Sequence, residues 1–197
     1  MSDGADVVLP ASDRSKALAT LVSAFIGDPL ERWLYPEAWA YLTHFPRFIE
    51  SFAGPAFEAD TAWCLGDYTA VALWLPPATE ADGDAIAGVI KDSVSPAKHR
   101  DAFAVLDLMA HGHPTGPHWY LSLLGVDSAH QGLGLGARLL TAGLKVVDAD
   151  HLPTYLETPN PRTVPFYERH GFVVTGRAQA GTCPPLVGML RPARSDR

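Results

Sequence analysis

The stretch Leu121–Gly136, LSLLGVDSAHQGLGLG, contains the feature that decides the fold of this 197-residue chain. An apolar run leads into a short polar loop, then into Gly132, Gly134 and Gly136, and a helical pattern follows from Ala137. A strand that passes through a glycine-rich turn into a helix N-terminus presents converging backbone N–H groups at the positive end of the helix dipole. Glycine permits both the turn and the close approach of a ligand. The stretch therefore predicts a site for a phosphate-bearing cofactor.

The spacing of the glycines separates this loop from other phosphate-binding loops. A Rossmann loop reads G-x-G-x-x-G after the first strand and a P-loop ends in G-K-[ST], whereas this chain reads G-x-G-x-G-A-R past its midpoint. A second block, NPRTVPFYERHGF, follows at Asn160–Phe172. Two blocks in order are more specific than either alone, because the expected context confirms a motif.

Together the two blocks resemble the GNAT acyltransferase superfamily. Its pattern V-x-x-x-x-[QR]-x-x-G-x-[GA] is matched by Val126, Gln131, Gly134 and Gly136, and Asn160–Phe172 looks like its N-x-x-x-x-x-x-Y-x-x-x-G-F block. The resemblance covers roughly residues 5–190. Within the superfamily the chain looks most like the puromycin N-acetyltransferase-like group, through segments such as Ala70–Trp74, Tyr120–Leu121, His130–Gly132 and Leu156–Thr158. Two positions depart from the pattern: Ser128 stands where the superfamily often has proline, and Thr163 where the group often has asparagine.

Composition places the chain among ordinary globular proteins. Hydrophobic residues make up 47% and charged residues 19%, and the net charge of −7 argues against nucleic acid as a partner, since phosphate binding needs a basic face. Cys64 and Cys183 have no C-x-x-C spacing, so we expect no disulfide framework and a reducing environment. Residues 1–6 lack the features of a signal peptide, and no apolar run approaches the length of a membrane span. We therefore expect a cytoplasmic protein, either a monomer or a homodimer, without membrane contact.

Hydrophobic periodicity and turn residues predict the order of helices and strands. Asp28-Pro29-Leu30-Glu31 combines an N-cap acid, a proline at N1 and a glutamate at N3, which is a typical helix start. The sequence predicts strands at 7–9, 62–65, 68–75, 118–126, 153–157, 172–175 and 186–190, with a hairpin turn at Gly66-Asp67. It predicts helices at 11–26, from 29, at 38–52 with Pro46 inside it, at 84–92, 97–109, 136–148 and 163–170, the last closed by Gly171.

These elements predict one α/β domain over residues 1–197. The strand–helix–strand run from His118 to Glu157 requires a parallel, right-handed crossover. By resemblance, the fold is a central mixed, mostly antiparallel twisted sheet with a parallel central strand pair and helices on both faces. Residues 79–117 are too few for a core of their own, so we interpret them as a helical insertion or lid.

The resemblance implies acetyl-CoA as the cosubstrate and no metal. Backbone N–H groups from Leu133 to Ala137 would bind the pyrophosphate, and backbone around Leu124–Val126 would pair with the pantetheine arm. Gly125 suits a β-bulge, where its N–H could face a developing oxyanion. The full predicted cofactor set is Leu124, Gly125, Val126, Gln131, Gly132, Leu133, Gly134, Leu135, Gly136, Ala137, Asn160 and Tyr167.

The chemistry of acyl transfer to an amine points to two further roles. An amine with a reference pKa of about 10.4 arrives as an ammonium and must lose a proton before it attacks. Glu157, at the end of a predicted strand beside the cofactor cleft, is the candidate general base, although a chain of waters could serve instead. Tyr167 matches the tyrosine that the family uses as general acid toward the leaving thiolate. The competing interpretation makes Tyr167 an ordinary core residue beside Phe166.

Aromatic and histidine clusters supply two weaker signals. Trp33, Tyr35 and Trp39 could line an acceptor pocket, although aromatic residues in an apolar helical segment more often form core. His111, His113 and His118 lie in or near a Gly/Pro loop, without the cysteines or the helical H-x-x-x-H of common metal sites, so we expect solvated histidines and no metal.

We therefore predict an acetyl-CoA-dependent N-acetyltransferase that acts on a primary amine of a small molecule by direct attack in a ternary complex. A protein lysine or N-terminal amine remains an alternative acceptor. The rival from another class is a non-catalytic acyl-CoA-binding regulatory module with the same fold.

Overall fold

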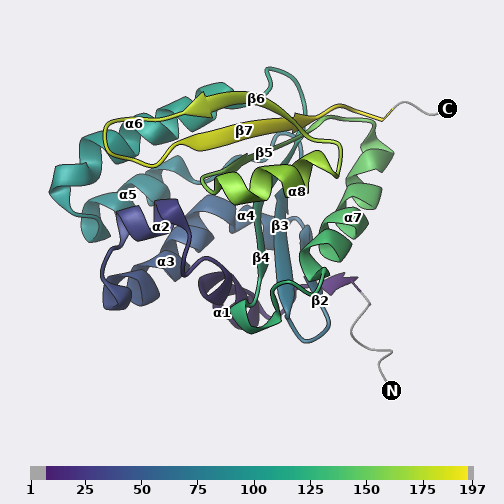
Figure 1. Ribbon diagram of the computed structural model, residues 1–197, viewed down its shortest axis with the longest axis horizontal. Helices are drawn as coiled ribbons and strands as arrows, with labels where there is room; N and C mark the ends of the chain where they lie inside the picture. Colours follow the sequence, from purple (N-terminus) through teal and green to yellow (C-terminus); the bar gives the residue numbers. More distant parts are fainter. Residues whose placement is uncertain (1–7, 195–197) are drawn as a thin grey trace.

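The computed structural model describes residues 8–194, and its centre is a seven-stranded sheet with the order β1-β2-β3-β4-β5-β7-β6 (Figure 1). Neighbouring strands are antiparallel, except that β4 and β5 are parallel. The strands are β1 (Val8–Pro10), β2 (Ala62–Leu65), β3 (Ala70–Leu75), β4 (Trp119–Val126), β5 (Thr154–Thr158), β6 (Val173–Ala178) and β7 (Leu186–Arg191). The predicted fold class, mostly antiparallel with one parallel central pair, is confirmed.

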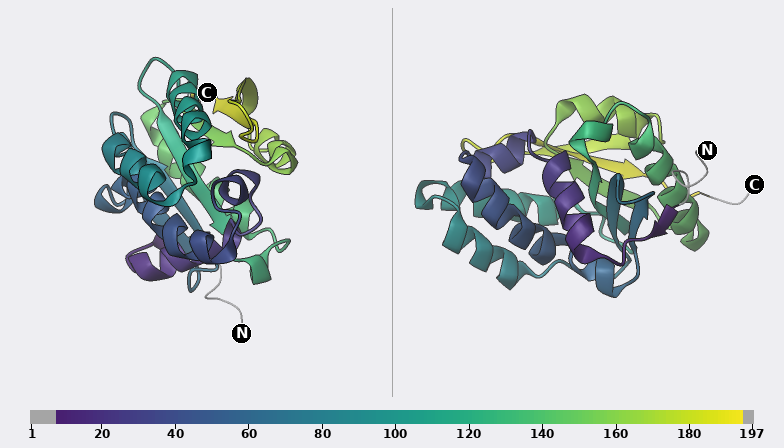
Figure 2. Two further views of the ribbon diagram at one scale, coloured as in Figure 1. Left: turned by 90° about the vertical axis from the view of Figure 1, so that its left-hand side faces the viewer. Right: turned by 90° about the horizontal axis from the view of Figure 1, so that it is seen from below.

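Helices cover both faces of this sheet (Figure 2). Those before β4 are α1 (Arg14–Ala24), α2 (Pro29–Leu34), α3 (Ala38–Ala53), α4 (Pro55–Glu58), α5 (Gly83–Ser93) and α6 (Pro96–Gly112). Those after it are η1 (Ser128–His130), α7 (Leu135–Val147), η2 (Asp148–Asp150), η3 (Pro161–Thr163) and α8 (Val164–Glu168). The predicted start of α2 is confirmed, because Asp28 Oδ1 accepts hydrogen bonds from the backbone N–H of Leu30 at 2.9 Å and of Glu31 at 3.3 Å.

The alternation of β3 divides the interior into two cores. Val71 and Leu73 pack with α1, α3 and α5 on one face, while Ala72 and Trp74 pack with α7 on the other. All six residues of β3 are buried, as expected for a central strand covered on both sides. Burial of each large apolar side chain contributes about 1.5–3 kcal/mol relative to exposure. Gly143 of α7 is needed here, because a Cβ atom would lie 2.8 Å from Cζ2 of Trp74.

Several predicted boundaries shift by a few residues. Val7, predicted to begin the first strand, lies outside the described residues. The strand predicted from Tyr68 begins at Ala70, because Tyr68 has a φ of 61° and belongs to the turn. The helix predicted at 163–170 is found as the shorter α8, which ends at Glu168 and is preceded by η3; Gly171 follows with a φ of 88°.

The parallel pair β4–β5 is joined only at its beginning. Trp119 pairs with Thr154 and Tyr120 with Tyr155, whereas Leu124–Val126 pair with β3 on the other side of β4. The two strands therefore diverge toward their carboxyl ends, and a cleft opens between Leu124–Val126 and the end of β5. Backbone groups of β4 that face this cleft are available to a ligand.

The irregularity in β4 lies at Ser122 and not at Gly125. Gly125 pairs regularly with Val71, while the register between β3 and β4 shifts between Leu73 and Trp74, opposite Ser122, whose hydroxyl donates to the carbonyl of Leu73 at 2.9 Å. The predicted bulge at Gly125 is thus a misassignment. A Cβ atom at Gly125 would lie 2.8 Å from Cβ of Ala24, so this glycine permits α1 to pack directly on the strand.

Residues 79–117 form α5, α6 and their flanking loops. Ile86, Val89 and Ile90 of α5 and Ala102 of α6 are buried in the core on the α3 face of the sheet. Val105 of α6 packs with Cys183 and Leu186 near β7. The role of this segment as an insertion or lid in a single domain stays a prediction.

Two further observations concern residues 8–194. No helix among them is long and apolar enough to cross a membrane. No three histidine, cysteine, aspartate or glutamate residues in this part of the chain are arranged to hold a metal ion.

Candidate functional site

A cavity of about 520 Å³ lies where the cleft between β4 and β5 meets α2, α3 and α6. Leu124–Val126 and Gln131 line its cofactor side, together with Thr158, Asn160 and Tyr167 beyond β5. Its other wall is largely apolar and comes from Trp33 of α2, Phe48 and Phe52 of α3, and Val105, Leu106 and Met109 of α6. Three carboxylic acids, Asp28, Glu31 and Glu157, also line it, and no lysine, arginine or histidine is among its described lining residues.

The glycine loop is shaped to receive an anion. Gly132 and Gly134 have φ angles of 79° and 77°, a region that other residues rarely adopt, and nothing lies within 4 Å of where their Cβ atoms would be. Gly134 caps the N-terminus of α7, whose first N–H groups have no acceptor within the helix. This open backbone at a helix start fits a pyrophosphate.

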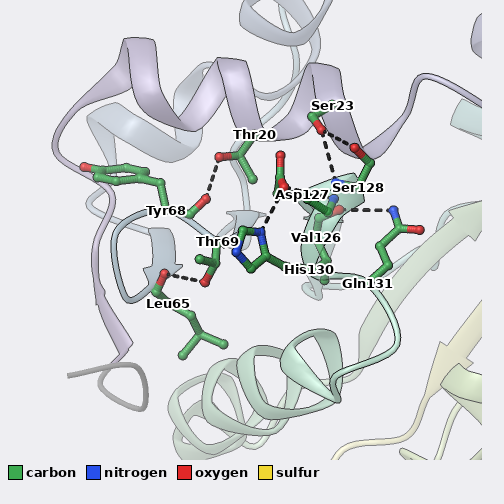
Figure 3. A network of polar contacts seen from close by, with 11 residues as sticks. Thr20, Ser23, Leu65, Tyr68, Thr69, Val126, Asp127, Ser128, His130 and Gln131 are labelled. Atoms are coloured by element: carbon green, nitrogen blue, oxygen red, sulfur yellow. Dashed lines mark hydrogen bonds and ion pairs between the residues drawn. The ribbon is translucent and has the colours of Figure 1, made fainter. Parts of the chain in front are cut away.

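A polar network holds the segment that enters this loop (Figure 3). Asp127 Oδ1 accepts from the backbone N–H of Ala129 at 3.0 Å and lies 2.9 Å from His130 Nδ1. The backbone N–H of Ser128 donates to Ser23 Oγ of α1 at 3.1 Å, and the side-chain amide of Gln131 donates to the carbonyl of Val126 at 3.1 Å. The network fixes the loop between β4 and α7 against α1. The hydrogen bond from Gln131 to Val126 stabilises the conformation of the loop itself.

Glu157 is a buried carboxyl group in an aromatic setting. Its side chain is 4% exposed, and neither oxygen accepts a hydrogen bond of good geometry from a described residue. Burial raises the pKa of Glu157 to about 7, and the nearby phenols of Tyr120 and Tyr155 offset part of that rise. A carboxyl group with a pKa near neutrality is suited to general base catalysis.

A pair of histidines extends from Glu157 toward the surface. His113 Nε2 lies 3.6 Å from Glu157 Oε1, and His113 Nδ1 lies 2.9 Å from His118 Nε2. His118 Nδ1 lies 2.7 Å from the carbonyl oxygen of Gly116. The ring of His113 packs on Tyr120 and Tyr155, with centroid separations of 4.6 and 4.7 Å. Burial, with a contribution from His118, lowers the pKa of His113 to about 4. The expectation that these histidines are solvated is wrong for His113, whose side chain is 26% exposed.

Tyr167 reaches the cavity from α8. Its ring packs against Phe166 and Phe172 at centroid separations of 5.0 and 5.8 Å, and it also lines the cavity. Burial, together with the negative charge of Asp28, raises the pKa of the Tyr167 phenol, which therefore stays protonated at neutral pH. Asp28 thus lies within electrostatic reach of Tyr167, across the same cavity.

Asp28 and Glu31 form an acidic pair at the start of α2. Burial raises the pKa of Asp28 to about 6, although its two backbone hydrogen bonds oppose the rise. Glu31 is 5% exposed, its Oε2 has no partner among the described residues, and burial followed by the charge of Asp28 raises its pKa well above the usual range. A cationic group entering the cavity would supply the positive counter-charge that these two buried acids lack.

The structure brings together most, but not all, of the predicted site residues. Leu124, Gly125, Val126, Gln131, Asn160, Glu157, Tyr167 and Trp33 line the one cavity. Gly132, Leu133, Gly134, Leu135, Gly136 and Ala137 form the adjacent loop and the first turn of α7, where the side chain of Leu135 enters the core. Tyr35 is 1% exposed in the core and Trp39 is 67% exposed on α3, and neither lines the cavity. Asn160 Oδ1 accepts from the backbone N–H of Arg162 at 3.1 Å and caps η3.

The sequence did not assign four residues to this site. The sequence pattern identifies Asp28 only as the N-cap of a helix and Glu31 only as the N3 residue of that helix. Tyr120 and His113 become neighbours of Glu157 through the parallel pairing of β4 with β5 and the end of α6. The alternation of β4 and β5, which places Tyr120, Tyr155 and Glu157 on one face, was the available signal.

Comparisons with known proteins agree with this geometry. Residues 35–172 match the sequence model of the acetyltransferase (GNAT) family. An uncharacterized N-acetyltransferase of Schizosaccharomyces pombe is 24% identical in an alignment of length 189 that covers 83% of this chain and 72% of that protein. A histone acetyltransferase HPA2 and related acetyltransferase from Corynebacterium glutamicum superposes with a TM-score of 0.66 at 26% identity, covering 96% of this chain and 97% of the other. Arylalkylamine N-acetyltransferase 2 from Aedes aegypti shares the fold, with a TM-score of 0.65 at 12% identity and coverage of 95% and 99%.

Proposed function

Because this chain belongs to the acetyltransferase (GNAT) family, we propose that it transfers the acetyl group of acetyl-CoA to a primary amine of a small molecule, by direct attack within a ternary complex. The observation that carries the proposal is that a single cavity holds a buried carboxyl group, Glu157, and a protonated phenol, Tyr167, and reaches Gln131, which directly precedes the open glycine loop. Acetyl-CoA is the acyl donor that the family uses. Held by the loop Gly132–Ala137 and the free edge of Leu124–Val126, it would supply the acetyl thioester.

The side chains then divide the proton transfers between them. The Glu157 carboxylate takes a proton from the acceptor ammonium and so produces the amine that attacks. The Tyr167 hydroxyl donates its proton to the departing thiolate. The pKa of Glu157, near neutrality, leaves a carboxylate available to accept a proton, and the raised pKa of Tyr167 keeps its phenol protonated and able to donate.

The lining of the cavity supports a cationic acceptor with an apolar body. Asp28, Glu31 and Glu157 offer carboxyl groups that a bound ammonium would favour in the ionised form, whereas a strongly anionic acceptor would meet buried carboxylic acids without a counter-ion. Trp33 and the apolar side chains of α3 and α6 fit the rest of such a molecule. Membership of the puromycin N-acetyltransferase-like group remains part of this proposal. A cytosolic location is also part of it, supported by Cys64 and Cys183, which are both buried and free.

A thiol-release assay with a panel of amines tests the proposal. The wild-type protein should release CoA with at least one small amine, faster than with peptides that offer a lysine or an N-terminal amine. Tyr167→Phe keeps the ring and should lower kcat by about 10²-fold, with little change in acetyl-CoA affinity, since positioned acids contribute about 10²–10⁴-fold. Tight binding of acetyl-CoA without turnover of any amine would instead support a regulatory module, and preference for peptides would support a protein acetyltransferase.

A further inference from the structure

Glu157 faces the cavity that admits the acceptor, and protein encloses the rest of its carboxyl group. Its side chain is 4% exposed, and the phenols of Tyr120 and Tyr155 and the ring of His113 lie beside it. Burial raises the pKa of both phenols, so neither tyrosine is ionised at neutral pH. A base that accepts a proton in every turnover must also release it. His113 and His118 continue from Glu157 toward the surface on the side away from the cavity wall of α2.

Building on the proposed function, we infer that His113 and His118 form a proton relay that carries the proton of the acceptor amine from Glu157 to solvent. The links are 3.6 Å from Glu157 Oε1 to His113 Nε2 and 2.9 Å from His113 Nδ1 to His118 Nε2. The first is just beyond hydrogen-bonding range, as catalytic contacts often are before the substrate is bound.

The contact between His118 and Gly116 assigns the tautomers of both histidine rings. The carbonyl oxygen of Gly116 can only accept, so His118 Nδ1 carries the hydrogen that it donates there. A neutral His118 then has a bare Nε2, to which His113 Nδ1–H donates. His113 Nε2 is therefore bare as well, and it faces the Glu157 carboxyl group. The low pKa of His113, about 4, agrees with a neutral ring at this position.

This arrangement of donors and acceptors permits a proton to move from Glu157 outward through the two rings. Once Glu157 holds the proton of the ammonium, its O–H bond breaks and an N–H bond forms at His113 Nε2. The Nδ1–H of His113 passes to His118 Nε2. Half-exposed His118 then carries a hydrogen on both nitrogens, and its Nδ1–H exchanges the Gly116 carbonyl for water and is released there. One proton enters and one leaves, Glu157 returns to the carboxylate, and the two rings regain their tautomers through water or ring rotation.

Variants of both histidines test the relay, with His111 as the matched control. The ring of His111 is exposed on α6, where its Nδ1–H donates to the carbonyl of Asp107 at 2.6 Å. We expect His113→Gln and His118→Ala to lower kcat about tenfold or more and to raise the solvent isotope effect, with KM for acetyl-CoA unchanged, whereas His111→Gln keeps the wild-type values. Added imidazole should restore activity to His118→Ala. Unchanged kcat in both variants, or a loss that imidazole does not restore and that leaves the isotope effect unchanged, would overturn the relay.

A second measurement does not depend on turnover. Ring ¹⁵N NMR of the wild-type protein should place the hydrogen on Nδ1 in both His113 and His118. A hydrogen on Nε2 of His113 would contradict the relay even if every amine is acetylated. Absence of turnover with every amine, while both rings show the Nδ1–H form, would count against the proposed acetyl transfer and leave the proton path intact. If His113→Gln does not fold, imidazole rescue of His118→Ala and the ring NMR still decide the question.

Discussion

Replacing Glu157 with glutamine should stabilise the protein at alkaline pH and much less at acidic pH. The folded pKa of about 7 lies above the ordinary 4.5, so folding favours the protonated acid. Stability is therefore lost as pH rises through the interval between these two values, and the loss is complete above pH 7. With about 1.4 kcal/mol for each pKa unit, the ionised carboxyl group costs about 3 kcal/mol at pH 8 but only about 1 kcal/mol at pH 5.

Urea unfolding of the wild type and Glu157→Gln at both pH values measures this difference. Glutamine has the same shape and no charge, so the variant should gain about 3 kcal/mol at pH 8 and about 1 kcal/mol at pH 5. For a domain of this size, the gain at pH 8 corresponds to a rise in Tm of roughly 6–12 °C. The variant should also lose acetyl transfer, because glutamine accepts no proton. A stability difference that is equal at the two pH values would refute the argument that burial raises the pKa of Glu157.

Three further predictions concern the glycines and the acidic pair. Acetyl-CoA at 100 times its Kd should stabilise the wild type by about 2.7 kcal/mol. Gly134→Val should abolish most of the resulting Tm shift. The control Gly176→Val, at a glycine on β6 that also has open space around it, should retain the shift. Gly125→Ala should lower the free energy of unfolding by about 1–3 kcal/mol, since its Cβ would meet Ala24 and Leu21; calorimetry showing equal stability would contradict the packing role. Glu31→Gln should raise KM for amines about tenfold without changing KM for acetyl-CoA in steady-state assays, and equal values would remove Glu31 from the acceptor site.

Local signals predicted much of this fold from the sequence. The Asp28 cap, the hairpin turn at Gly66-Asp67 and the glycine loop before α7 depend on residues adjacent in the chain, and all three are found where the pattern places them. The parallel β4–β5 pair follows from chain order, because a helix separates two strands that lie side by side.

Contacts between distant segments explain what the sequence could not reveal. Gly125 was interpreted as a bulge because its role, to admit Ala24 of α1, depends on a helix a hundred residues earlier. His113 looked like a loop histidine until the end of α6 placed its ring between Tyr120 and Tyr155. Periodicity also could not say which aromatic residues of α2 and α3 face the cavity, since that depends on how those helices pack.

The short pairing of β4 with β5 has a mechanical consequence for the whole molecule. Every strand up to β4 comes from the first part of the chain and every strand from β5 onward from the last part, and the two half-sheets share a ladder at only two residue pairs. Cohesion between the halves therefore comes mainly from side chains, such as those of α7 against Trp74 and Leu156. A molecule bound along the free edge of β4 would span this weakest line of the sheet. Such a ligand would couple the two half-sheets mechanically and resist sliding of one against the other.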